Sequence, residues 1–168
     1  MQEITQKKNK LDLLKSILPE LNQFKNVHGL KPAILIFEGA QAVISLYELM
    51  LRSSKEQDAF LTIDVIPKPL QSYLKKDYIL HKRSLGVKSR VLVEESIHAF
   101  HYQKMDHKSN RVTKIITRGH IPFQCEIIIS QKEEVAMIDF SHELIGVHIQ
   151  SNTIRNTLKA IFDHLWEL

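Results

Sequence analysis

The sequence predicts a mixed α/β domain in which helices cover both faces of a β-sheet, preceded by an N-terminal helix of the coiled-coil type. Three observations predict this class. Apolar residues near the N-terminus recur at heptad spacing, the middle of the chain alternates short apolar runs with helical stripes, and four further strand-like runs precede a final amphipathic helix. Layer rules turn that order into a sheet covered by helices on both sides.

The first 25 residues predict one helix with an apolar seam. The seam consists of Ile4, Leu11 and Leu18 at a positions and Leu14 and Leu21 at d positions. A seam of this kind is buried against a partner, so we expect residues 1–26 to be a linker and dimerisation helix and residues 27–168 to be the main domain. The alternative is an amphipathic helix that packs on its own domain.

Three strand–helix units follow in the pattern. Their strands are expected at 33–37, 59–66 and 89–93, and their helices at about 43–50, 70–85 and 96–105. Gly86 follows the second helix, at the position where a left-handed residue ends helices. The regular alternation indicates strands joined by helical connections.

The C-terminal half reads as an antiparallel run of strands, at 112–117, 123–129, 135–140 and 144–149. A closing helix begins after Ser151 or Asn152 as its cap, and its stripe from Ile154 through Ile161 to Trp166 is expected to lie against the sheet. Cys125 is in phase with the apolar residues of its strand, which predicts inert packing and not a nucleophile.

Composition is that of an ordinary globular protein, with 168 residues, 43% of them hydrophobic and 25% charged. No apolar run is long enough to span a bilayer and the N-terminus lacks the apolar stretch of a secretory signal, so we expect a cytoplasmic protein with no membrane partner. A single cysteine excludes Cys-rich zinc sites and fits a reducing compartment.

Positive charge is concentrated in the middle of the chain. Residues 68–118 hold twelve Lys and Arg but only four acidic residues, within a sequence whose formal net charge is +4. Such a stretch is usually a solvated face, and it also allows a nucleic-acid-binding module as an alternative function.

Catalytic signatures are absent from the sequence. No G-x-G-x-x-G, P-loop or G-x-S-x-G motif occurs, and we expect no catalytic residues, no metal site and no cofactor. Open α/β sheets bind ligands beyond the carboxyl ends of their strands. On that ground Glu38, Asp64, Arg118 and His120 are the candidate effector-binding residues.

Several segments, taken together, resemble the C-terminal regulatory part of TrmB-like transcriptional regulators, which has a phospholipase D-like fold. The segments are LLKSILPELNQF (13–24), KPAILIFEGAQAVISLYELML (31–51), KRSLGVKSRVLVEES (82–96) and EVAMIDFSHELIGVHIQSNTIRNTLKAIFDHLW (134–166). In the family these segments are a linker helix, a strand–Glu–Gly–helix opening, a helix–Gly–strand step and a strand pair closed by a helix.

The resemblance implies a homodimer that senses an unidentified small effector and passes the signal to DNA through a winged-helix domain absent from this chain. Enzymes of the phospholipase D superfamily need H-x-K-x-x-x-x-D, and none of the nine histidines here has a lysine two residues later. The resemblance therefore implies a non-catalytic regulatory domain, either cut from a longer regulator or free-standing. The rival from another class is a divergent phosphodiesterase or nuclease that uses some of His98, His101 and His107.

Overall fold

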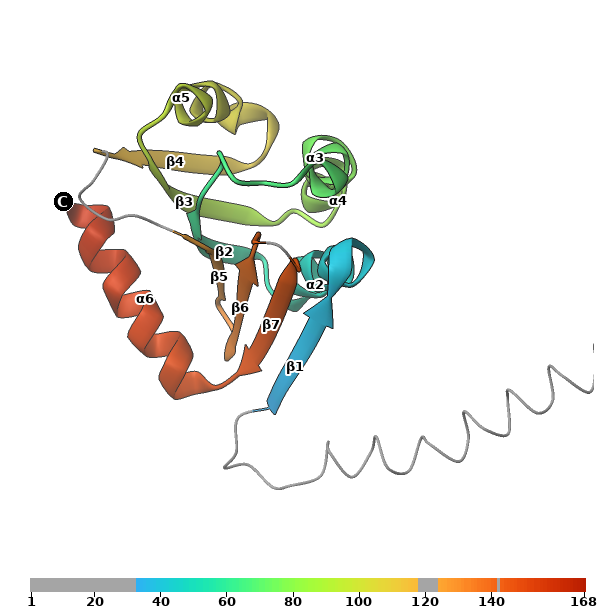
Figure 1. Ribbon diagram of the computed structural model, residues 1–168. Coiled ribbons are helices and arrows are strands. Elements are labelled where there is room, and N and C mark those ends of the chain that lie inside the picture. Colours follow the sequence, from blue (N-terminus) through green and yellow to red (C-terminus); the bar gives the residue numbers. More distant parts are fainter. Residues whose placement is uncertain (1–32, 118–123, 142) are drawn as a thin grey trace, which may run out of the picture. The chain divides into compact units, whose positions relative to one another are not determined.

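A seven-stranded mixed β-sheet forms the centre of the computed structural model (Figure 1), with strand order β1-β7-β6-β5-β2-β3-β4. The structure describes residues 33–117, 124–141 and 143–168. The strands are β1 (Ala33–Glu38), β2 (Glu56–Leu61), β3 (Lys88–Glu94), β4 (Arg111–Ile116), β5 (Glu126–Ser130), β6 (Glu134–Asp139) and β7 (Ile145–Gln150). β2, β3 and β4 run parallel, whereas β5 is antiparallel to β2 and continues into the antiparallel β5-β6-β7 ladder.

In the described part of the chain, five α-helices lie between and after these strands. They are α2 (Gly39–Ser53), α3 (Lys68–Lys75), α4 (Asp77–Ser84), α5 (Ile97–Lys104) and α6 (Asn152–Glu167), and a short 3-10 turn, η1 (Asp106–Lys108), follows α5. Helices α3 and α4 connect β2 to its parallel neighbour β3. Helix α5 connects β3 to its parallel neighbour β4. No helix among the described residues is long and apolar enough to cross a membrane.

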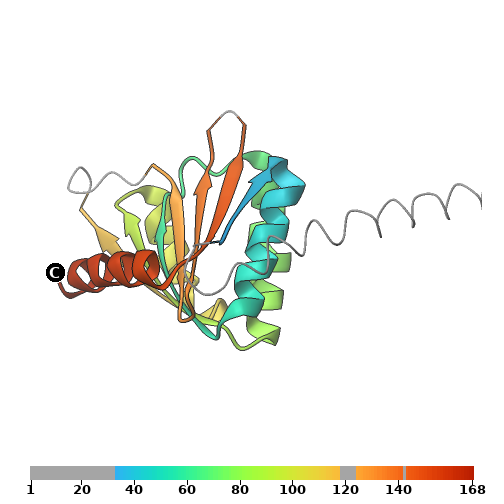
Figure 2. The same ribbon diagram turned by 90° about the horizontal axis from the view of Figure 1, so that it is seen from below.

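Helices cover both faces of the sheet, as the sequence predicts. Figure 2 shows α6 on one side of the strands and α2 on the other. On the α2 side, the core joins Leu46, Tyr47 and Leu70 to sheet residues such as Val91 and Ile128. On the α6 side, the core is built from Phe60, Leu92, Ile129 and Phe162. Neighbouring residues Ala59 and Phe60 thus belong to opposite cores, as the two-residue period of a strand requires.

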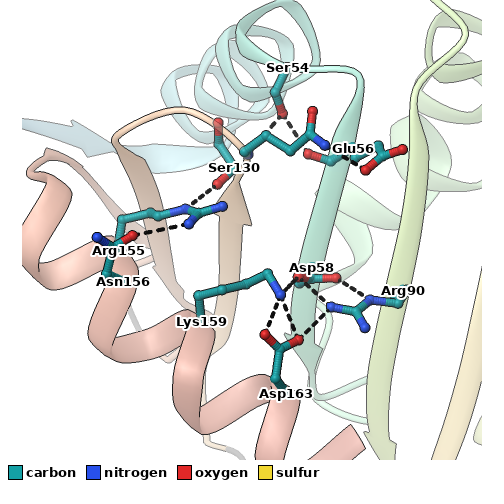
Figure 3. A network of polar contacts seen from close by, with 10 residues as sticks. Ser54, Glu56, Asp58, Arg90, Ser130, Arg155, Asn156, Lys159 and Asp163 are labelled. Atoms are coloured by element: carbon teal, nitrogen blue, oxygen red, sulfur yellow. Dashed lines mark hydrogen bonds and ion pairs between the residues drawn. The ribbon is translucent and has the colours of Figure 1, made fainter.

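An ion-pair network attaches α6 to the sheet (Figure 3). Arg90 of β3 donates from Nε to Oδ1 of Asp58 at 2.7 Å, and from Nη2 to Oδ1 of Asp163 at 2.7 Å. Asp58 and Arg90 face each other in the β2–β3 register. The guanidinium carbon of Arg90 also lies 5.0 Å from the ring centroid of Phe162. One side chain therefore combines charge pairing with aromatic contact to hold the helix in place.

The structure corrects two expectations for the strands. β4 is parallel to β3 and not part of the antiparallel half, because the α5 crossover returns the chain to the same end of the sheet before β4 begins. β2 occupies Glu56–Leu61 and not 59–66. The first half of β2 contains polar residues, so the apolar pattern does not reveal it as a strand. Asp58 in this half can be buried because Arg90 pairs with it.

The helices differ from the sequence pattern in two places. The expected helix at 70–85 is two helices, α3 and α4, with a break at Lys76. In α6, Ile154 and Ile161 are exposed and do not lie against the sheet, whereas Phe162 is fully buried. Gly86 does take the left-handed conformation after α4, with φ of +68°.

Candidate functional site

A cavity of about 610 Å³ lies between the sheet and the helices α3, α4 and α5. We call it the main cavity. Its floor is formed by apolar residues on three neighbouring strands, Ala59, Val91 and Ile128, which are adjacent in the β2–β3 and β2–β5 registers. Leu74 and Ile79 of the helices form part of the opposite wall. A mostly apolar cavity of this volume is typical of sites for small organic molecules.

Glu126 is the buried acid of the main cavity. It begins β5 and is 7% exposed. The hydroxyl of Tyr47, on α2, donates a hydrogen bond to Oε2 of Glu126. Burial raises the pKa of the Glu126 carboxyl to about 7, although the Tyr47 hydrogen bond lowers it. Among the described residues no lysine, arginine or histidine forms an ion pair with Glu126.

Lys82 is the buried base of the same cavity. It comes from α4, is 3% exposed, and donates from Nζ to Oγ of Ser89 on β3. Burial and the nearby Arg111 guanidinium together lower the pKa of Lys82 to about 7, although Asp106 raises it. An ammonium group has three donors, and Ser89 is its one hydrogen-bond partner among the described side chains.

Arg111 lies at the Lys82 end of the main cavity but is neutralised within the protein. Its Nε donates to Oδ1 of Asp106 at 2.7 Å, and its Nη2 donates to the carbonyl of Tyr102 at 2.6 Å. The guanidinium carbon stands 3.3 Å from the ring centroid of Tyr102. Asp106 in turn accepts from the backbone N–H of Thr113 at 2.6 Å. Lys82 itself forms no ion pair at this end, although the Asp106 carboxylate that pairs with Arg111 is near enough to favour its charged form.

Histidines and an aspartate lie along another part of the cavity lining. Nδ1 of His98 lies 2.7 Å from Oδ1 of Asp64, and both side chains are exposed. His101, one turn later on α5, also lines the cavity. Across the described segments, no group of three or more His, Cys, Asp and Glu is placed so that it could hold a metal ion.

The candidate residues predicted from the sequence are not all brought together. Asp64 lies three residues beyond β2 and lines the main cavity. Glu38 ends β1 at the far edge of the sheet, separated from β2 by three strands, and does not line this cavity. Arg118 and His120, together with the seam residues Ile4, Leu11, Leu14, Leu18 and Leu21, lie outside the described residues.

Sequence reasoning did not identify the two buried charges of the main cavity. Glu126 stands in an otherwise apolar run, E-I-I-I, and a lone acid inside a predicted strand is the signal that points to it. Lys82 stands in the polar helix segment H-K-R-S, where nothing distinguishes it from its exposed neighbours. Cys125 precedes β5 and is half-buried. Burial, with Asp139 and Glu126 nearby, raises the pKa of its thiol, which disfavours the reactive thiolate.

Known proteins resemble this chain in fold but not in sequence. No protein-family model and no curated protein matches the chain. Among solved structures, TrmBL2, described as an archaeal chromatin protein with a novel mode of DNA binding, matches over 98% of this chain with a TM-score of 0.57 and 16% identity. This chain spans 61% of the TrmBL2 chain.

Two other solved structures share the architecture. NucT from Helicobacter pylori matches 82% of this chain and 97% of its own, with a TM-score of 0.59 and 12% identity. Polyphosphate kinase from Porphyromonas gingivalis matches 85% of this chain and 28% of its own, with a TM-score of 0.52 and 10% identity. The chain therefore has a phospholipase D-like α/β fold. At these identities the likeness concerns the fold alone.

Proposed function

We propose that this chain is a non-catalytic regulatory domain of the TrmB-like type, which pairs through its N-terminal helix and binds a small effector in the main cavity. The observation that carries the proposal is the cavity itself, which has the volume and the apolar walls of a ligand site and holds two buried charged side chains. The fold shared with TrmBL2, a protein described as binding DNA, supports a regulatory role.

In this proposal the effector acts by changing how two copies associate. A ligand shifts such an equilibrium only if it binds one arrangement better than the other. Helices α3, α4 and α5 both line the main cavity and contact the rest of the domain, so a bound molecule would bias their positions. DNA would be read by a winged-helix segment joined to the regulator, and not by this domain.

The pairing part of the proposal is tested on the intact chain by sedimentation velocity. The double variant Leu14→Glu, Leu18→Glu places charges in the expected seam, and Ser16→Glu adds a charge at an outward heptad position as the matched control. We expect the wild type and Ser16→Glu to be dimers at micromolar concentration and the double variant to be a monomer. A monomeric wild type would refute the pairing.

A phosphodiesterase is the second candidate function, because the Asp64–His98 pair and His101 share one cavity. A carboxylate that orients a histidine is a common arrangement for general acid–base chemistry. The test is hydrolysis of bis-p-nitrophenyl phosphate by purified protein. Turnover that disappears in His101→Ala would favour the enzyme over the regulatory domain, and we expect no turnover above the buffer rate.

A further inference from the structure

The main cavity holds an acid and a base, Glu126 and Lys82, each 93% or more buried and neither in an ion pair with another described residue. Glu126 has the Tyr47 hydroxyl as its hydrogen-bond partner, and Lys82 has the Ser89 hydroxyl. Among the described residues, no ion pair and no hydrogen bond joins these two side chains to each other. Burying a charge without a partner is costly, so a ligand group of the opposite charge would stabilise the ionised form of each side chain.

The two charges lie toward opposite ends of the cavity. Ser89, which holds Lys82, is level with Gln57 in the β2–β3 register. Glu126 lies one residue beyond the Phe60–Ile127 pair in the β2–β5 register. Along β2, the level of Ser89 and the level of Glu126 are four residues apart, which is roughly 13 Å at the usual rise of a strand. Between these ends the floor is the apolar row of Ala59, Val91 and Ile128.

We propose that the main cavity binds an elongated zwitterion, with a positively charged amino group against Glu126, an anionic group against Lys82, and an apolar chain between them. The inference rests on the proposed effector-binding function and specifies its ligand. Each end would form a charge-assisted hydrogen bond in a site shielded from water, where such bonds are strongest. The apolar floor excludes a ligand that is polar along its whole length.

The proposal is tested by isothermal titration calorimetry of the intact chain at neutral pH with a matched set of small probes. The probes are ω-aminooctanoate, suberate, diaminooctane and the shorter γ-aminobutyrate. The first three share a chain length and differ in the charge at each end. We expect ω-aminooctanoate to bind about tenfold or more tightly than the other three, because each mismatched end loses one charge-assisted bond and the short chain cannot reach both ends.

Two substitutions separate the ends. Glu126→Gln should remove the preference for the amino group and Lys82→Met the preference for the carboxylate, each lowering affinity for ω-aminooctanoate about tenfold or more. Glu133→Gln and Lys132→Met, which are exposed positions at the β5–β6 turn, are the controls and should bind as the wild type does. Circular dichroism verifies that each variant is folded.

Proton exchange on binding gives a second readout. Because both groups have a pKa of about 7, an ammonium ligand should drive a proton off Glu126 and a carboxylate should draw one onto Lys82. In the wild type the two effects cancel. Titrations in buffers of different ionisation enthalpy should show release of about half a proton in Lys82→Met and uptake of about half a proton in Glu126→Gln.

Equal binding of the three long probes, unchanged affinity in both variants, or no binding of ω-aminooctanoate at millimolar concentration would each overturn the proposal. The regulatory function is judged separately, by sedimentation with and without the probe. Binding through Glu126 and Lys82 with no change in association would leave the ligand class standing and refute the regulatory proposal. A dimer that binds none of the probes would refute the proposed ligand class and leave the pairing part of the regulatory proposal standing.

Discussion

Replacing Glu126 by Gln should make the domain more stable at neutral and alkaline pH and have little effect in acid. The glutamate pKa is about 7 in the folded protein and 4.5 in the reference state. Because the pKa of Glu126 is higher in the folded state, its contribution to stability is fully present at pH values below the unfolded-state pKa. This contribution is lost as the pH rises through the folded-state pKa. The difference corresponds to about 3 kcal/mol of unfolding free energy.

The measurement is urea unfolding of the wild type and Glu126→Gln, followed by Trp166 fluorescence between about pH 4 and pH 8. The stability of the variant relative to the wild type should grow by about 3 kcal/mol across that range and level off above neutrality. Lys82 also titrates near neutrality, but it is present in both proteins and its effect cancels in the difference. Glu133→Gln is the exposed control. A difference that stays constant with pH would refute a raised pKa for the buried Glu126 carboxyl.

Three further perturbations test other parts of the structure. Arg90→Met should cost about 1–3 kcal/mol of unfolding free energy, because it leaves the buried Asp58 without its strongest partner, while the exposed Lys88→Met on the same strand should cost little. Gly146→Val should cost about 1–3 kcal/mol, because even a Cβ there would lie 2.6 Å from Cδ2 of the fully buried Leu46; a urea midpoint equal to that of the wild type would contradict this. Burial lowers the pKa of His148, whose ring nitrogens have no hydrogen-bond partner among the described residues. The stability of the wild type relative to His148→Leu should therefore fall as the pH drops below about 6.5, and a stability difference that does not change with pH would contradict this.

Most of the fold could be predicted from the sequence because the apolar pattern records which faces are buried. The phases of Ala59–Leu61 and of the three strands β5 to β7 follow it directly, and so does the start of α6 at Ser151. The direction of β4 could not be read from that pattern. Orientation is set by the crossover through α5, and a strand has the same two-residue period whichever way it runs.

The candidate site was harder to predict than the fold. Asp64 was found because it follows a strand, a rule that depends on topology. Lys82 and Glu126 were not found, because their burial results from the packing of α4, α5 and β5 around a hollow and leaves no local trace in the sequence. Glu38 satisfies the same strand-end rule as Asp64 but belongs to an edge strand remote from the cavity.

The pairing of β1 with β7 has a consequence for biosynthesis. The first strand of the sheet finds its neighbour only in residues 145–150, more than a hundred positions later along the chain. On the ribosome, the backbone of β1 emerges more than a hundred residues before that of β7, so its strand pairing must wait until β7 has been synthesised. Until then the edge of β1 is unpaired, and nascent chains of this protein should therefore depend on chaperones that bind unpaired strands.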